Sequence, residues 1–271
     1  MAGACTIVGA AGFVGAALDA RLRAQGLNPY APAKGDPELL ARDLGCVFYC
    51  AGLTADYAAR PFDTVEAHAA LPAEIARRGR FERFIYLSST RLYDGGAAAE
   101  PVREDAPLML RPAEPRHIYD LSKALGENIA LTRMDGRGAA ARLSNVFGWN
   151  DGDPGFLSEW LARARTGRTL ELESSPHVAR DYIHLDDVVD ALIAMSEAQS
   201  PGIVNVASGE LVTNAALAEV FAAEGWTISF RGDADPPPPP CADVGRLRAL
   251  GVAPRPVLDV VRGYLQAAAR P

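Results

Sequence analysis

The chain has 271 residues, of which 49% are hydrophobic and 23% are charged, enough for one large core or a core with a small second lobe. A formal net charge of -7 argues against a nucleic-acid-binding protein, which usually carries a basic stripe. No apolar run reaches the roughly 18 residues that a membrane span needs, and residues 1–8 lack the basic start of a signal peptide. We therefore expect a cytoplasmic protein with no nucleic-acid and no membrane partner.

The first half of the chain alternates short apolar runs with stretches of helical composition. The runs lie at residues 6–8, 46–50, 84–87 and 139–143, and the two clearest helices at residues 13–25 and 118–132. Strands that alternate with helices of this length indicate βαβ units and a parallel sheet that is buried on both faces. Because such crossovers are right-handed, residues 1–150 are predicted to form a doubly wound parallel sheet of the α/β class.

From about residue 151 the composition changes. Helices are expected at residues 156–165, 214–223 and 257–269, and a strand at residues 203–206. We expect residues 151–271 to form mainly a small lobe over the carboxyl edge of the sheet, while a strand and helix near 180–198 return to the first domain. Five consecutive prolines, residues 236–240, must be extended, either as a loop within the domain or as a segment that a partner recognises.

A glycine-rich turn, GAAGFVG at residues 9–15, follows the first strand and opens the first helix. Gly9 permits a tight turn, Gly12 lets a pyrophosphate approach the backbone, and Gly15 allows close packing of helix and strand. The amide groups at the start of the helix, including those of Phe13 and Val14, would attract the same anion. The context of strand, turn and helix therefore predicts a dinucleotide site, although a plain Gly/Ala-rich turn is the alternative.

The acidic residue that usually ends the second strand and binds a ribose hydroxyl is not evident in this chain. Lys34 could pair with a 2′-phosphate, which would favour NADP, and Asp36 could touch the adenine amino group. A solvated loop lysine is the alternative for Lys34. The stretch up to Cys46 is short, so a strand found in longer relatives could be missing, and the choice between NAD and NADP stays open.

Three polar residues have the pattern of a proton-transfer group. Ser89 ends the third apolar run, and Tyr119 and Lys123 share one face of the following helix because they are four residues apart. A lysine ammonium group near a phenol is expected to lower the phenol pKa from about 10, so that Tyr119 could exchange a proton with a carbinol or ketone near neutral pH. The serine hydroxyl could bind the same substrate oxygen.

The cysteines carry no metal-site signal. Cys5, Cys46, Cys50 and Cys241 show no paired C-x-x-C spacing, so we expect free thiols and no metal.

These motifs together resemble the extended short-chain dehydrogenase/reductase family, in particular the NAD-dependent epimerase/dehydratase group that includes UDP-glucose 4-epimerase. The resemblance covers nearly the whole chain and implies a Rossmann domain followed by a substrate-binding lobe. It implies catalytic roles for Ser89, Tyr119 and Lys123, and it places Ala51 and Gly52 near the nicotinamide ribose. Tyr119 and Lys123 would also contact the cofactor. Two departures are Asp94 in place of a glycine and His68 near a position that usually holds Asn.

The second half of the chain resembles the same family in its substrate-binding motifs. Asn145 begins NVFG, Arg180 begins RDYIHLDDV, and Arg231 begins RGD. The resemblance implies that Asn145 and the two arginines bind the diphosphate of a sugar nucleotide, which suits the bidentate pairing of guanidinium with phosphate. Thr90 is expected to contact the sugar. The alternative for Arg180 is an ion pair with Asp186 or Asp187, and His184 is expected to be a packed residue between the lobes.

The resemblance leaves several reactions open. A 4,6-dehydratase would need an Asp-Glu pair directly after the catalytic serine, where this chain has Thr90 and Arg91, so dehydration is disfavoured. We expect a 4-epimerase that acts through a transient 4-keto sugar. A 4-ketosugar reductase or dehydrogenase is the first alternative, and a nucleotide-binding protein without turnover is the second. The family also implies a homodimer that forms through the helices at residues 62–78 and 119–134.

Overall fold

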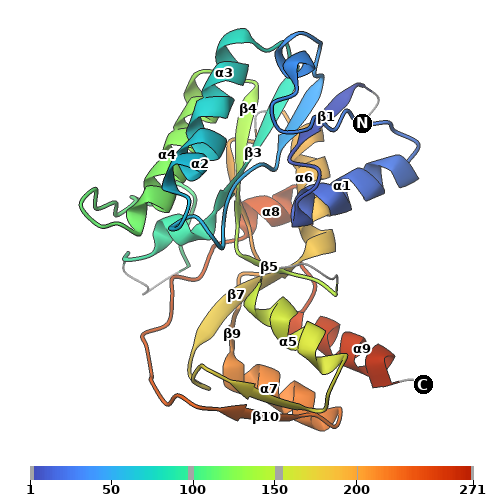
Figure 1. Cartoon of the computed structure of the whole chain (residues 1–271), viewed down its shortest axis with the longest axis vertical. Coiled ribbons are helices and arrows are strands. Elements are labelled where there is room, and N and C mark those ends of the chain that lie inside the picture. The colour runs from blue at the N-terminus through green and yellow to red at the C-terminus, as the bar shows by residue number, and fades with distance from the viewer. Residues whose placement is uncertain (1–2, 97–100, 150–154, 200, 270–271) are drawn as a thin grey trace.

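A parallel sheet of five strands lies at the centre of the larger lobe, at the top of Figure 1. The computed structural model describes residues 3–96, 101–149, 155–199 and 201–269. The strand order is β1-β2-β3-β4-β8, and every neighbouring pair is parallel. The strand bounds are β1 Cys5–Val8, β2 Cys46–Tyr49, β3 Arg83–Ser89, β4 Gly138–Leu143 and β8 Ile203–Val206. Four of these strands contain the apolar runs of the first half of the chain.

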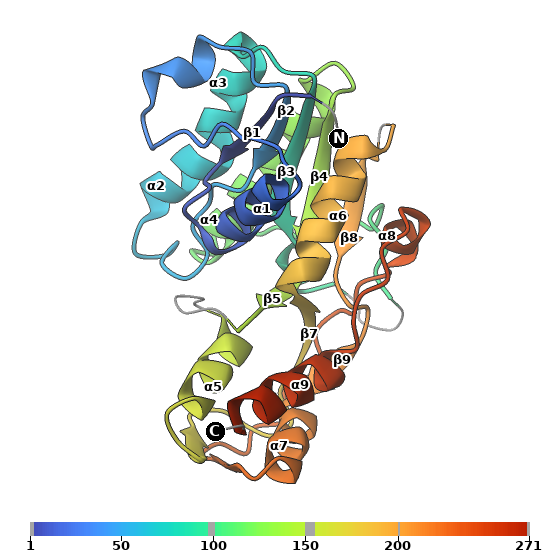
Figure 2. The ribbon, with the colours of Figure 1, turned by 90° about the vertical axis from the view of Figure 1, so that its right-hand side faces the viewer.

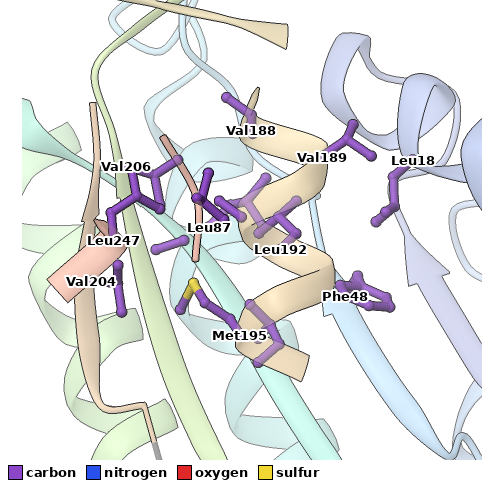
Figure 3. Close-up of a cluster of buried hydrophobic side chains, with 14 of the residues drawn as sticks. Leu18, Phe48, Leu87, Val188, Val189, Leu192, Met195, Val204, Val206 and Leu247 are labelled. Atoms are coloured by element: carbon purple, nitrogen blue, oxygen red, sulfur yellow. The ribbon is translucent and has the colours of Figure 1, made fainter. Parts of the chain in front are cut away.

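Each face of this sheet is covered by its own helices, because successive strand side chains point to opposite faces. One face packs against α1 (Phe13–Ala24), α6 (Leu185–Glu197) and α8 (Gly245–Ala249), the other against α3 (Leu71–Arg78) and α4 (His117–Thr132). Figure 3 shows the first face, where Leu192 of α6 belongs to the same buried cluster as Phe48 of β2 and Leu18 of α1. The predicted doubly wound α/β fold is confirmed.

The helix predicted at residues 62–78 is continuous but contains a π-helical turn. It comprises α2 (Pro61–Val65), the π-helical segment η2 (Glu66–Ala70) and α3. Two buried tyrosine hydroxyls from the sheet donate to carbonyl groups of that turn, Tyr49 to Ala67 at 2.6 Å and Tyr86 to His68 at 2.8 Å. Side chains that take backbone carbonyl groups in this way are a common cause of such irregular turns.

Between the first helix and residue 46, where a missing strand was expected, the chain forms an isolated β-bridge rather than a strand. Tyr30 makes a single bridge to Thr6, with hydrogen bonds to the backbone of Cys5 and Ile7, and no longer strand is formed there. Pro29 precedes Tyr30 and Pro32 follows it closely, and proline cannot donate to a strand ladder. The 3-10 turn η1 (Pro37–Leu40) then leads into β2.

The smaller lobe, at the bottom of Figure 1, has its own core. It contains a sheet with the order β5-β7-β9 and a parallel pair of β6 and β10. Its elements are β5 Asn145–Phe147, α5 Phe156–Ala164, β6 Thr169–Leu172, β7 Ala179–His184, β9 Leu211–Thr213, α7 Asn214–Ala223, β10 Thr227–Phe230 and α9 Val257–Ala269. Trp160 and Phe221 lie at the centre of this core and are fully buried. The three helices predicted in this half are found within one residue of their expected bounds.

A strand and a helix near 180–198 were expected to return to the first domain, but only the helix does so. The helix α6 packs against the main sheet, but the strand β7 before it pairs with β5 and β9 instead. The strand that extends the main sheet is β8, whose Val204 pairs with Ala141 of β4. β8 is apolar enough for burial on both faces of a parallel sheet, whereas β7 carries Arg180 and Asp181. In Figure 2 the connections between the lobes pass through a narrow waist.

Candidate active site

A cleft of about 670 Å³ lies where the two lobes meet. The larger lobe contributes residues at the carboxyl ends of its strands and at the start of α1, among them Gly12, Gly52 and Ser89. The smaller lobe contributes residues such as Phe156 and Arg180. Ligand sites in open parallel sheets lie at this carboxyl edge, so the cleft is the candidate site.

The structure brings Ser89, Tyr119 and Lys123 together on one wall of this cleft. Ser89 ends β3, and Tyr119 and Lys123 lie one turn apart on α4, each with only 4% of its surface exposed. Ser89 lies close enough to Tyr119 for its hydroxyl to affect the pKa of the phenol. The Lys123 ammonium group donates to the carbonyl of Leu87 at 2.8 Å. Gly126 permits this close packing of α4 on the sheet, since a Cβ there would lie 2.2 Å from the Tyr86 hydroxyl.

The electrostatics of this group differ from the expectation that Lys123 lowers the pKa of Tyr119. Burial raises the pKa of Tyr119, and the nearby Ser89 hydroxyl and the charge of Arg91 oppose that rise without cancelling it. Burial also lowers the pKa of Lys123 to about 7, which Glu127 only partly counters. The expectation failed because a buried ammonium group is itself destabilised, so its charge is weakened near neutral pH.

His68, which departs from the family pattern, is a fully buried neighbour of Tyr119 with partners at both ring nitrogens. Its Nε2 accepts the backbone N–H of Leu53 at 3.2 Å, so Nδ1 carries the proton and donates to the Ser122 hydroxyl at 2.9 Å. The Ser122 hydroxyl in turn donates to the carbonyl of Tyr119. Burial, reinforced by the charge of Lys123, lowers the pKa of His68 to about 3, which keeps the imidazole neutral.

The glycine turn has the geometry that a bound pyrophosphate requires. Gly9 adopts a φ of +90°, and a Cβ there would lie 2.7 Å from the backbone nitrogen of Ala51. A Cβ at Gly15 would lie 2.3 Å from the carbonyl oxygen of Gly9, so this glycine allows the helix to approach the strand. Gly12 caps α1 without a side-chain bond, and Gly12, Phe13 and Val14 line the cleft. These residues fit a dinucleotide, because the start of α1 lines the cleft and no side chain caps its first-turn amides.

Of the other residues predicted to bind the cofactor, some lie at the cleft and others do not. Gly52 lines the cleft, and Ala51 lies against Gly9. Lys34 is 84% exposed in its side chain and lies 3.7 Å from Asp63. Asp36 accepts the Tyr30 hydroxyl at 2.9 Å and the backbone N–H of Glu38 at 3.0 Å. Neither Lys34 nor Asp36 lines the cleft, so their contacts with a cofactor stay predictions.

At the other end of the cleft, Thr90, Asn145 and Arg180 are brought together. Thr90 donates to the carbonyl of Leu143 at 3.3 Å, and Asn145 donates to the carbonyl of Asp181 at 2.8 Å. The guanidinium of Arg180 lies 4.3 Å from the Phe156 ring centroid, and its buried Nη1 has no hydrogen-bond partner among the described residues. A buried donor without a partner fits an anionic ligand.

The alternative role considered for Arg180 is not observed. Asp187, one of its two expected ion-pair partners, is 2.9 Å from the guanidinium of Arg255. Asp186 lies near Arg21 and Arg255. His184 packs between these groups and Tyr264, in agreement with the prediction of a packed residue.

Arg231 does not line the cleft in this structure, so its contact with a diphosphate stays a prediction. Its guanidinium lies outside the cleft, follows β10 and pairs with Glu171 at 2.8 Å and Glu173 at 2.5 Å. Glu171 lies on β6, which pairs with β10, so the local sheet provides these acidic partners. The RGD motif therefore does not bring Arg231 to Arg180 in this conformation.

Several residues in or beside the cleft carry no motif in the sequence. Arg91 was noted only as the absence of an acid, yet it lies against the face of Tyr119. Tyr57 lies in a loop with no motif, and its ring centroid is 5.2 Å from that of Tyr119. Pro239 and Pro240, the end of the proline run, line the cleft as part of an extended segment. Only the tertiary fold brings these residues to the site.

Two further observations concern possible metal sites and membrane spans in the described part of the chain. Its residues include no group of three or more His, Cys, Asp or Glu side chains that could hold a metal ion. The helices in the described ranges are too short or too polar to cross a membrane.

Comparisons with known proteins agree with this geometry. The NAD dependent epimerase/dehydratase family model matches residues 5–207. The chain is 30% identical to a protein of Oryza sativa subsp. japonica named "Putative GDP-L-fucose synthase 2", over 96% of this chain and 86% of that one. It is also 30% identical to dTDP-6-deoxy-L-talose 4-dehydrogenase (NAD(P)(+)) of Kitasatospora kifunensis, over 80% of this chain and 78% of that one.

The fold is likewise similar to solved structures. MoeE5 in complex with UDP-glucose and NAD superimposes with a TM-score of 0.81 at 22% identity, over 97% of this chain and 98% of that one. This likeness confirms the Rossmann fold with its second lobe. Together with the family match over most of the chain, it shows that the chain belongs to the NAD-dependent epimerase/dehydratase family and is an NAD(P)-dependent enzyme of the extended short-chain dehydrogenase type.

Proposed function

We propose that this enzyme inverts C4 of a nucleotide-linked sugar through a transient 4-keto sugar. The observation that carries the proposal is the shared cleft, with Ser89, Tyr119 and Lys123 on one wall and the partnerless Nη1 of Arg180 toward the smaller lobe. The first group suits proton exchange with a carbinol, and the second suits a diphosphate.

Tyr119 acts as the proton carrier in this scheme. In the oxidation step the C4–H bond breaks with transfer of a hydride, and the phenolate of Tyr119 takes the proton of the C4 hydroxyl. Ser89 donates a hydrogen bond to the same oxygen and so holds it in place. A bound nicotinamide would supply the hydride acceptor and return the hydride to the opposite face of the ketone, while Tyr119 returns the proton. Lys123 supports the phenolate whenever it carries its proton.

Dehydration is disfavoured by the residues after Ser89. Elimination of water from the neighbouring carbons needs an acid and a base beside the ketone. Thr90 donates its hydroxyl to a backbone carbonyl, and Arg91 is a permanent cation. Neither side chain can accept and return the protons of such an elimination.

A 4-ketosugar reductase is the second candidate function. It would use the same three residues with an exchangeable cofactor, and two relatives with 30% identity carry names of synthase and 4-dehydrogenase activities. Exposed Lys34, if it binds a 2′-phosphate, would favour NADP and this reaction.

The experiment combines the cofactor content of the purified protein with product analysis. An epimerase retains NAD absorbance and converts a nucleotide hexose to its C4 epimer without added cofactor. A reductase lacks retained cofactor and consumes NADPH when a 4-keto sugar nucleotide is supplied. A protein that shows ligand-dependent thermal stabilisation but no turnover of any sugar nucleotide would contradict both reactions and favour a nucleotide-binding role.

We further propose that the enzyme is a cytoplasmic homodimer. Its helices α2 and α4 contact each other and expose large apolar side chains, Phe62 at 87%, Val65 at 37% and Leu125 at 51%. Apolar side chains gathered on neighbouring helices suit a protein interface. Light scattering of the wild type and of Phe62→Glu would test this, with a monomeric variant expected.

A further inference from the structure

A permanent cation lies against the ring of Tyr119. The guanidinium carbon of Arg91 is 4.9 Å from the centroid of the Tyr119 ring and 4.7 Å from that of Tyr57. Arg91 belongs to the 3-10 turn η3 (Thr90–Tyr93) at the end of β3, and it lines the cleft. No feature of the proposed reaction described above uses this side chain.

The position of Arg91 is fixed from several sides. Its Nη2 donates to the Tyr57 hydroxyl at 2.7 Å, and its Nε lies 3.4 Å from a carboxylate oxygen of buried Asp120. Its backbone N–H donates to the Ser89 hydroxyl at 3.2 Å. The guanidinium is therefore held at the ring rather than extended into solvent.

The other groups around Tyr119 provide less positive charge. Lys123 lies 6.0 Å from the ring centroid, directs its ammonium at the Leu87 carbonyl, and has a pKa lowered to about 7 by burial. His68 meets the ring edge-on at 5.2 Å and is neutral. Arg91 keeps its charge at every pH at which the enzyme is folded.

The acidic groups in this region work against a phenolate. Asp120 follows Tyr119 directly, and its negative charge raises the pKa of Tyr119. Asp120 also faces His117 at 3.7 Å, while Asp94 lies 3.7 Å from Arg116. Arg91 is a cation in direct contact with both Asp120 and the Tyr119 ring, so its positive charge offsets the negative charge of Asp120 next to the phenol.

We propose that Arg91 is a positioning residue that favours the phenolate form of Tyr119, against the burial and the Asp120 charge that oppose it, by placing a fixed positive charge on the ring. The inference rests on the proposed role of Tyr119 as proton carrier. It predicts that the charge of Arg91, and not its shape or its hydrogen bond to Tyr57, sets the pH at which Tyr119 ionises.

The test is the ultraviolet titration of Tyr119 in the cofactor-free protein, taken as the difference between each protein and its Tyr119→Phe counterpart. Arg91→Met is expected to move this titration up by about one pH unit, the scale of a partly screened unit charge at this distance. Arg91→Gln keeps a polar side chain and should give the same shift. Arg91→Lys keeps the charge, so its Tyr119 titration should lie close to that of the wild type. Circular dichroism of each variant checks that the fold is retained.

The proposal would be overturned if both neutral variants titrated like the wild type, or if Arg91→Lys shifted the titration as much as the neutral variants do. The limb of the pH–rate profile governed by Tyr119 should move by the same amount in whichever direction the reaction is followed. A change in KM alone that is equal at all pH values would assign Arg91 to substrate binding instead. The titration needs no turnover, so a failed assay with a shifted titration counts against the proposed reaction, and an unshifted titration in an active enzyme counts against Arg91.

Discussion

The two ends of the cleft differ in the chemical groups that line them. The cofactor end consists of backbone, with Gly9, Gly12 and Gly15 around the start of α1. The substrate end consists of long polar side chains such as Arg180 and Arg91, each packed against an aromatic ring from another part of the sequence. A backbone site is encoded by adjacent residues, whereas a side-chain site depends on which residues the fold brings near. The comparison explains why one end is much easier to predict from sequence.

Tyr119 stands between the two ends, so its removal should have the largest effect on turnover and little on either binding site. Tyr119→Phe is expected to lower kcat by roughly two to four orders of magnitude, the usual scale of lost acid–base catalysis. Cofactor affinity, measured by titration calorimetry, should be nearly unchanged. A fully active Phe variant would contradict the proton role and leave only a binding site.

Arg180→Ala tests whether the substrate end depends on a single, partly buried charge. We expect a loss of about 2–5 kcal/mol in sugar-nucleotide binding, the cost of truncating a buried charged partner. Because Arg231 lies outside the cleft in two exposed ion pairs, Arg231→Ala is the matched control and should change substrate binding by less than about 0.5 kcal/mol. Equal losses in both variants would mean that Arg231 moves into the cleft when substrate binds.

Two glycine variants separate packing from ligand approach at the cofactor end. Gly15→Ala forces a Cβ to 2.3 Å from a backbone oxygen, and such overpacking should cost about 1–3 kcal/mol of stability. Gly12→Ala meets its nearest atom at 3.4 Å, an ordinary contact, so stability should be kept while cofactor affinity falls. Urea unfolding and cofactor titration of both variants measure these effects. Loss of stability in Gly12→Ala would show that both glycines serve packing.

The pH dependence of stability tests the burial of Lys123. Its pKa is about 7 in the folded protein against 10.5 when exposed, so above pH 7 the unfolded chain binds the extra proton. Stability should therefore rise with pH, and Lys123→Met should remove an increase of about 2 kcal/mol between pH 7 and pH 9. Urea unfolding of both proteins at the two pH values gives the difference. If the wild type and Lys123→Met had the same pH dependence, the Lys123 ammonium group would be solvated in the folded protein.

Much of the fold was predictable because it depends on local patterns. The strands of the main sheet and the helix α9 follow from short apolar runs and helical periodicity, and GAAGFVG marks the cofactor turn without help from the rest of the chain. The position of β7 was not predictable, because RDYIH does not say which strand will pair with it. The pairing belongs to the tertiary fold.

The site followed the same division. Ser89, Tyr119 and Lys123 were predicted because their spacing on one strand end and one helix face fixes their proximity. The pairing of Arg231 with Glu171 and Glu173 could not be predicted, because the motif does not reveal which side chains the sheet brings near it. The raised pKa of Tyr119 was missed because burial, unlike spacing, cannot be read from neighbouring residues.

The proline run has a consequence for what the cleft can recognise. Pro239 and Pro240 form part of its wall, and neither carries a backbone N–H. This wall can therefore offer only carbonyl oxygens and ring carbons, which suit the hydroxyl groups and apolar face of a carbohydrate rather than a phosphate. Since the rings also fix the backbone before any ligand arrives, little conformational entropy is lost when this segment makes contact.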